Sequence, residues 1–151
     1  MTNRLEMLED WATGLLRQLD QVSRKKLARN LGHELRRSQQ RRITAQKNLD
    51  GNRYAPRNKN NLQYWTGKLK RKGRMFQSLR TRRLLKTKVN DNKIMIGFTQ
   101  QTAQIARVHQ FGLRERNIIH KRREILGLTD FDITLIRSEL IKHVIHNQKQ
   151  I

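Results

Sequence analysis

The chain has 151 residues, contains no cysteine and carries a formal net charge of +22. This length suits one domain, but a hydrophobic fraction of 35% is low for a compact globule, so part of the chain is expected to lie outside the core. The absence of cysteine excludes a disulfide scaffold and thiolate metal sites. No apolar run is long enough for a membrane helix, and the acidic start does not resemble a secretion signal, so we expect no membrane association.

The excess charge is concentrated in the middle of the chain. Residues 1–22 contain 2 basic and 4 acidic residues, which gives a net charge of −2. Residues 23–90 contain 22 basic and 2 acidic residues, for a net charge of +20. Residues 91–151 contain 10 basic and 6 acidic residues, for a net charge of +4. Unpaired like charges cannot be buried, so this segment must face solvent, nucleic acid or an acidic protein surface. The candidate contacts to a polyanion are nine basic residues: Arg36, Arg37, Arg41, Arg42, Lys68, Lys70, Arg71, Lys72 and Arg74.

Two amphipathic helices are predicted at the start of the chain. The first, over about residues 3–20, has apolar residues at three- and four-residue steps: Leu5, Leu8, Ala12, Leu15, Leu16, Leu19 and Val22. Asp20 or Ser23 can cap the second helix, which ends near residue 47. Its apolar residues recur in steps of four and eight: Leu27, Leu31, Leu35 and Ile43. Both stripes are typical of packing against a sheet or a neighbouring subunit.

Residues 48–73 are predicted to form a mobile basic loop, because turn-forming residues and charge replace any periodic apolar face. Three aromatic residues, Tyr54, Tyr64 and Trp65, lie among the basic ones. Such interleaving allows aromatic rings to stack on bases beside phosphate contacts. A small local cluster or a subunit contact explains the same residues, and no known nucleic-acid-binding framework surrounds them.

A β-hairpin is predicted over residues 84–98. Leu85, Thr87 and Val89 alternate on one arm, and Ile94, Ile96 and Phe98 alternate on the other. Thr99 or Thr102 can then cap a short helix that Gly112 ends by adopting a positive φ, with Ile105, Val108 and Phe111 packed inward or against the hairpin. Ile118 and Ile119 are candidates for another short strand.

The last element is a helix over about residues 130–146. Thr129 and Asp132 have the spacing of a capping box, and an apolar stripe follows at Ile133, Ile136, Leu140 and Val144. The elements together predict an α+β fold with two N-terminal helices, a small antiparallel sheet based on a β-hairpin, a short helix and a C-terminal helix.

No arrangement of residues predicts catalysis. Glu139, His143 and His146 share a helical face and can in principle bind a metal, but two histidines near a helix end also complement its dipole. His109 is more readily explained by a structural hydrogen bond. No phosphate-binding loop and no sequence-reading DNA-binding motif is present, so we expect no catalytic residue, metal or cofactor.

Three ordered motifs carry a family resemblance: Asp50-Gly51-Asn52-Arg53-Tyr54-Ala55-Pro56-Arg57, Ala106-Arg107-Val108-His109-Gln110-Phe111-Gly112, and Arg123-Glu124-Ile125-Leu126-Gly127-Leu128-Thr129 with Asp132. In this order the chain resembles the virion morphogenesis or tail completion family of contractile-tailed and Mu-like phages. It departs from the family pattern at Lys121-Arg122-Arg123 and Ile125, where a proline and an aromatic residue are expected. The motif residues implied to form interfaces are Gly51, Tyr54, Pro56, His109, Phe111, Gly112, Leu126, Gly127 and Leu128.

The resemblance implies a single tail completion domain over residues 1–151 that has no enzymatic activity. It implies a subunit that finishes the tail and prepares it for head–tail joining, as a ring, commonly hexameric, at the tail end or neck. The implied partners are copies of the chain itself, tail tube or tail terminator proteins and head connector proteins, in the virion and, during assembly, in the host cytoplasm. The alternative is a basic protein that contacts DNA or another nucleic acid without strong sequence specificity.

Overall fold

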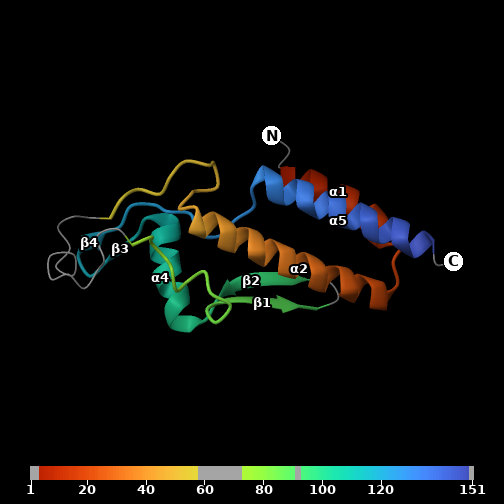
Figure 1. Ribbon diagram of the computed structural model, residues 1–151, viewed down its shortest axis with the longest axis horizontal. Helices are drawn as coiled ribbons and strands as arrows, with labels where there is room; N and C mark the ends of the chain where they lie inside the picture. Colours follow the sequence, from red (N-terminus) through yellow and green to blue (C-terminus); the bar gives the residue numbers. More distant parts are fainter. Residues whose placement is uncertain (1–3, 58–72, 91–92, 150–151) are drawn as a thin grey trace. The chain divides into compact units, whose positions relative to one another are not determined.

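The computed structural model describes residues 4–57, 73–90 and 93–149 (Figure 1). Within these ranges it contains four helices and two two-stranded sheets. In chain order the elements are α1 (Arg4–Leu16), α2 (Gln21–Thr44), β1 (Leu85–Val89), β2 (Ile94–Phe98), α4 (Gln100–Phe111), β3 (Arg114–Glu115), β4 (Ile118–Ile119) and α5 (Asp130–Gln148). The predicted α+β class and the order of its elements are confirmed.

The chain divides into two compact units, each built from segments that are distant in sequence. The first unit consists of Met1–Ser38, Lys86–Ile96 and Leu128–Ile151, and the second of Gln39–Leu85 and Gly97–Gly127. The assignment of a single domain to residues 1–151 stays a prediction. Of the predicted mobile loop, residues 58–72 lie outside the described residues.

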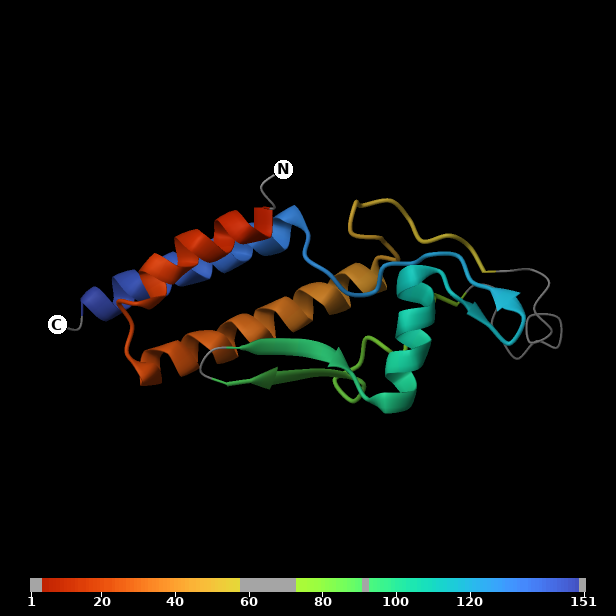
Figure 2. The same ribbon diagram turned by 180° about the vertical axis from the view of Figure 1, so that it is seen from behind.

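The core of the first unit is formed by helices whose apolar stripes face each other. Helix α1 runs alongside α5 in both views (Figures 1 and 2). The buried cluster consists of Leu19, Leu27, Leu31, Leu140 and Val144, with Ala12, Leu15, Leu16, Ile94 and Ile136 packed against it. The predicted stripes are therefore confirmed in most positions.

Two residues depart from the first predicted stripe, since Leu5 is 44% exposed and Val22 is 77% exposed. Helix α1 ends at Leu16 and α2 begins at Gln21, so Val22 belongs to the first turn of a new helix with its own phase. Asp20 caps this start, because its carboxylate accepts the Ser23 N–H at 2.7 Å. The same hydrogen bond is the main cause of the lowered pKa of Asp20.

The predicted capping box at the start of α5 is present. Thr129 N–H donates to Asp132 Oδ2 at 2.9 Å, and Asp132 N–H donates to Thr129 Oγ1 at 3.2 Å. Asp132 is fully buried, and its second oxygen accepts the Ser38 hydroxyl of α2. The cap thereby also links α5 to α2.

Strands β1 and β2 form the predicted hairpin, with arrows that point in opposite directions in Figure 2. Gly32 of α2 allows this hairpin to approach the helix closely. A Cβ atom at this position would lie 2.9 Å from Thr87 Cγ2, 3.1 Å from Val89 Cγ2 and 3.3 Å from Ile94 Cγ2. Thr87, Val89 and Ile94, which alternate along the two strands, therefore form the face of the hairpin that packs on α2.

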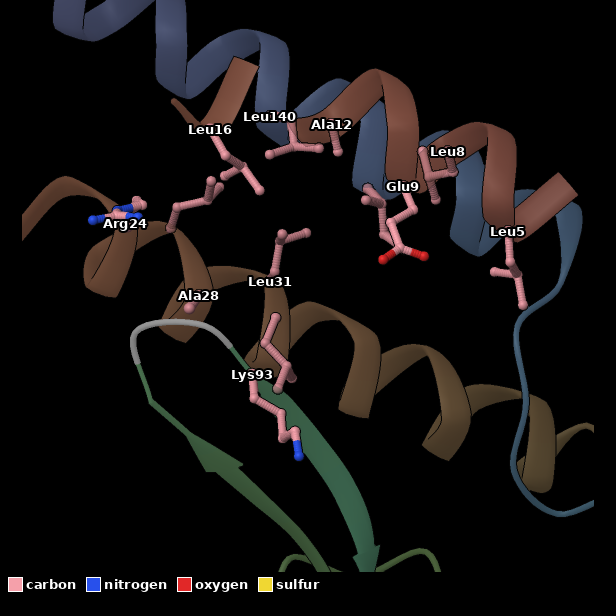
Figure 3. Close-up of a pocket in the computed structure, with 13 residues that line it drawn as sticks. Leu5, Leu8, Glu9, Ala12, Leu16, Arg24, Ala28, Leu31, Lys93 and Leu140 are labelled. Carbon is pink, nitrogen blue, oxygen red and sulfur yellow. The ribbon is translucent and has the colours of Figure 1, made fainter. Parts of the chain in front are cut away.

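The first unit also contains an apolar groove of about 380 Å³ between α1, α2 and α5 (Figure 3). Leucine, isoleucine and alanine side chains form most of its lining, and Figure 3 shows the Glu9 carboxylate on the α1 side facing the gap toward α2. Arg24 and Lys93 add polar ends to the lining.

The second unit has a small core of its own. Ile43, Leu79, Ala106 and Ile125 are buried together, with Phe76, Leu84, Phe98 and Leu126 packed against them. Helix α4 begins after Thr99, whose side chain makes no capping bond, and is terminated after Phe111 by Gly112, which adopts φ 64° as predicted. The predicted inward packing holds for Val108 but is wrong for Ile105 and Phe111, which are 49% and 61% exposed, because the helix turns only one narrow face to this small core.

Ile118 and Ile119 form the short strand β4, which confirms that prediction. It pairs antiparallel with β3, with Arg114 opposite Ile119 and Glu115 opposite Ile118. Both isoleucines remain exposed, at 45% and 73%.

Candidate functional site

The family motifs converge in the second unit on the extended segment 120–127. This segment lacks regular secondary structure apart from a bend. Its backbone polar groups therefore need partners outside a sheet or helix, and side chains from α2, the 46–57 segment and α4 supply them. We call this arrangement the motif network.

Gln110, near the end of α4, binds the backbone of this segment in the manner of a neighbouring strand. Its Oε1 accepts the N–H groups of Ile125 and Leu126 at 2.7 and 2.9 Å, and its Nε2 donates to the Leu126 carbonyl at 2.9 Å. One side chain thus satisfies three backbone groups and fixes the register of the segment.

Arg123 is the central cation of the motif network and is only 5% exposed. Its Nε donates to the Ala55 carbonyl at 2.7 Å, and its Nη2 donates to the Pro56 carbonyl at 2.8 Å. Its Nη1 lies 3.2 Å from His109 Nδ1. Burial, and secondarily the charge of Arg57, lower the pKa of Arg123. Through these contacts Arg123, which belongs to the third motif, connects Ala55 and Pro56 of the first motif with His109 of the second.

His109 must be neutral in this setting. Burial is the main cause that lowers its pKa to about 4, and the charges of Arg123 and His120 act in the same direction. A guanidinium only donates hydrogen bonds, so Nδ1 of His109 is the acceptor and its proton resides on Nε2. The ring also makes edge contacts with Phe76 and His120, each at a centroid distance of 4.9 Å. This geometry agrees with the structural hydrogen bond that the sequence predicts for His109.

Tyr54 and Arg42 hold the other side of the extended segment. The Tyr54 hydroxyl donates to the Glu124 carbonyl at 3.0 Å, and burial raises the pKa of this phenol. Arg42 Nη1 donates to the same carbonyl at 2.7 Å, and its Nη2 donates to the Ile125 carbonyl at 2.6 Å. The Asn48 carboxamide oxygen accepts the Glu124 N–H at 2.9 Å, which completes this anchor.

Two motif glycines have geometric reasons to be glycine. Gly51 adopts φ 88° in the turn between Asn48 and Asn52, a conformation that disfavours other residues. At Gly127 a Cβ atom would lie 2.4 Å from Leu49 Cδ1, so a side chain at this position requires the Leu49 side chain to move.

The structure places the motif residues in different settings. Tyr54 and His109 have side chains in the motif network, Pro56 contributes its carbonyl, and Leu126 contributes backbone groups. Phe111 is exposed, and Leu128 belongs to the other unit. Their assignment as interface residues stays a prediction.

The nine basic residues predicted to contact a polyanion also lie in different settings. Arg36 is buried, and the Arg42 guanidinium is bound to carbonyls and to Gln39, so neither presents its charge as a polyanion contact requires. Arg37, Arg41 and Arg74 are exposed. Lys68, Lys70, Arg71 and Lys72 lie outside the described residues, as do Tyr64 and Trp65. Contact with a polyanion stays a prediction.

The histidines considered for a metal site have other partners. His143 Nε2 lies 3.0 Å from the Ser23 carbonyl, and Glu139 pairs with Lys142 at 3.7 Å. Within the described ranges, no group of three or more His, Asp or Glu side chains is arranged to hold a metal ion. In the same ranges, no helix combines the length and apolar character needed to cross a membrane.

Sequence reasoning did not single out Gln110 and Arg123 as central residues, although both lie within the quoted motifs. Arg123 was considered only as the first residue of the third motif and as part of a departure from the family pattern. In the structure both residues at this departure stabilise the second unit. Arg123 donates to two backbone carbonyls, and the Ile125 side chain is fully buried.

Comparison with known proteins agrees with the motif order. Residues 3–145 match the model of the phage virion morphogenesis family, and the chain belongs to this family. It is 38% identical over 149 residues to tail completion protein S of Escherichia phage P2, which covers 94% of this chain and 98% of that protein. No solved structure matches the chain. The resemblance inferred from the three motifs is therefore confirmed.

Proposed function

We propose that this protein completes the phage tail as a structural subunit without enzymatic activity, at the tail end or neck, and prepares the tail for head–tail joining. The observation that carries the proposal is the similarity to tail completion protein S of phage P2 over nearly the full length of both chains. The motif network supports it, because its polar side chains bind backbone groups and hold segments together.

Assembly into a ring, with six copies as the expected number, is the second part of the proposal. Large apolar side chains are exposed on both units, among them Phe111 and Ile119 on the second unit and Phe131 on the first, each more than 60% exposed. Exposed apolar side chains become candidates for burial against a partner where they gather into a patch, and the interfaces of a closed ring bury such patches between copies. Tail tube or tail terminator proteins and the head connector are the proposed further partners, with assembly in the host cytoplasm and final location in the virion.

Electron microscopy of particles from a phage that lacks this gene tests the tail function. We expect tails that are incomplete and not joined to heads, and recovery when the wild-type protein is supplied. Normal, head-joined and infectious particles without the protein would overturn the proposal. Light scattering coupled to size exclusion tests the ring separately, by comparing wild-type mass with that of Phe111→Ser and Ile119→Ser.

Nucleic-acid binding without strong sequence specificity is the second candidate function, and the net charge of +22 favours it. Binding to labelled duplex and single-stranded DNA should then weaken steeply as salt rises, because phosphate contacts release counterions. Absence of binding at low salt would remove this candidate without affecting the tail function.

A further inference from the structure

A hollow of about 410 Å³ in the second unit brings three arginines together. Arg41 comes from the last turns of α2, while Arg74 and Arg80 come from the segment that precedes β1. Gln40, Thr44 and Ala45 complete the lining, which includes no acidic residue. We call this feature the arginine hollow. Its lining includes neither Gln110 nor Arg123, the central side chains of the motif network.

Acidic side chains do not neutralise these arginines within the described part of the chain. The ion pairs found there involve Arg4, Arg37, Arg122 and Lys142, and none involves a residue of the hollow. Arg80 is oriented by a neutral partner, since its Nε and Nη2 lie 3.3 and 3.2 Å from Gln77 Oε1. Three like charges around one open hollow repel each other, and a bound anion relieves this repulsion.

The backbone that carries these arginines is held in place before any ligand binds. Gln46 Oε1 accepts the Met75 N–H at 2.7 Å, and Gln46 Nε2 donates to the Met75 carbonyl at 2.8 Å. Arg57 donates to the carbonyls of Gly73 and Arg74, at 2.6 and 3.3 Å. The residues next to Arg74 are therefore fixed to the segment that follows α2, which reduces the ordering that binding requires.

We propose that the arginine hollow binds a carboxylate-bearing segment of another virion protein. This inference rests on the proposed function, which supplies such partners. The planar guanidinium fork matches a carboxylate in two-point geometry. The adjacent Arg42 turns inward to backbone carbonyls and adds no charge to the hollow. A hollow of this size with three arginines fits one or a few carboxylates, whereas a nucleic-acid backbone needs a basic groove that continues over several nucleotides, so an acidic protein segment is the proposed occupant.

Titration of the full-length protein with fluorescein-labelled hexaglutamate tests this proposal. The test variant combines Arg41→Gln, Arg74→Gln and Arg80→Gln. Its matched control combines Lys26→Gln, Arg29→Gln and Arg137→Gln, which remove the same charge from exposed positions of the first unit. We expect the test variant to bind at least about tenfold more weakly, since charge-assisted hydrogen bonds are lost, and the control to change by less than about twofold.

A third variant replaces the same three arginines of the hollow by lysine and keeps the charge without the fork. Its affinity should fall between those of the wild type and the glutamine variant, and it serves as the test if the glutamine variant fails to fold. Equal losses in the test and control variants, or no binding by the wild type, would overturn the proposal. A larger loss toward a labelled DNA duplex than toward hexaglutamate would also overturn it, in favour of nucleic acid.

Complementation of a phage that lacks the gene separates the two proposals. Normal tails without the protein would refute the tail function whatever the peptide binding shows. Full recovery of infectious particles by the glutamine variant would refute the hollow as a docking site while leaving the tail function intact. We expect recovery with the control variant and reduced recovery with the test variant.

Discussion

Arg123 and His109 are joined by two hydrogen bonds. The Arg123 backbone N–H donates to the His109 carbonyl at 2.7 Å, and the guanidinium Nη1 lies 3.2 Å from His109 Nδ1. The first bond holds the extended segment against the end of α4, and the second requires a neutral imidazole. The stability of this part of the protein should therefore depend on both side chains and on pH.

Arg123→Lys should destabilise the protein by about 2–4 kcal/mol. The reason is that an ammonium group cannot replace the planar guanidinium that reaches Ala55, Pro56 and His109, so buried carbonyls are left without donors. Urea unfolding at pH 7 measures the change. Arg122→Lys is the matched control, since Arg122 is exposed and makes only a surface ion pair, and it should change stability by less than about 0.5 kcal/mol. Similar effects from the two substitutions would contradict the central position of Arg123.

Stability should fall as the pH is lowered from about 6.5 to 4. The folded His109 has a pKa of about 4 against an ordinary 6.5, so the unfolded chain binds more protons in this window. The contribution is present above pH 6.5 and is lost through the window, with a size of about 1–2 kcal/mol after allowance for solvent screening of a partly exposed ring. His109→Gln keeps an acceptor for Arg123 but cannot titrate.

Urea midpoints of the wild type and His109→Gln at pH 7 and pH 5 give the contribution of this ring by difference, since the other histidines are common to both. We expect a smaller loss on acidification in the variant. An identical pH dependence would show that His109 titrates normally in the folded protein.

Two helical glycines should respond to alanine with opposite signs. Gly14→Ala in α1 should stabilise by about 0.5–1 kcal/mol, because a Cβ there meets no atom within 4 Å and alanine favours helix. Gly32→Ala in α2 should destabilise by about 1–2 kcal/mol, since the added atom would lie 2.9 Å from Thr87 Cγ2. Thermal unfolding of both variants checks the signs, and an unchanged or raised melting temperature for Gly32→Ala would contradict the close packing of the hairpin on α2.

Asp132→Asn should cost about 1–2 kcal/mol, because the amide removes one acceptor from a fully buried cap that serves Thr129 and Ser38. Asp130→Asn is the control on the same helical turn, where the carboxylate is exposed and pairs with Arg4. Chemical denaturation should show a clear loss for the first variant and a change of less than about 0.5 kcal/mol for the second. Equal losses would indicate that the helix dipole, and not the capping box, matters here.

Local patterns in the sequence were sufficient to predict the type and order of the helices and strands. The stripe of α5, the capping box at Thr129 and Asp132 and the positive φ of Gly112 all depend on residues within a few positions of each other. Periodicity and capping express short-range backbone geometry, so they can be interpreted without a three-dimensional structure. The family also followed from sequence, because three motifs in a fixed order carry it.

The tertiary structure decided what the charged and polar side chains do. Arg42 belongs to a basic run that predicts an outward charge, yet it donates to the Glu124 carbonyl 82 residues further along the chain. Gln110 and Arg123 likewise find their partners on other segments. A hydrogen bond is made to whatever the fold brings within about 3 Å, and the sequence does not specify that neighbour. Composition therefore determined that this protein is strongly basic, while folding selected which arginines support the structure and which line the arginine hollow.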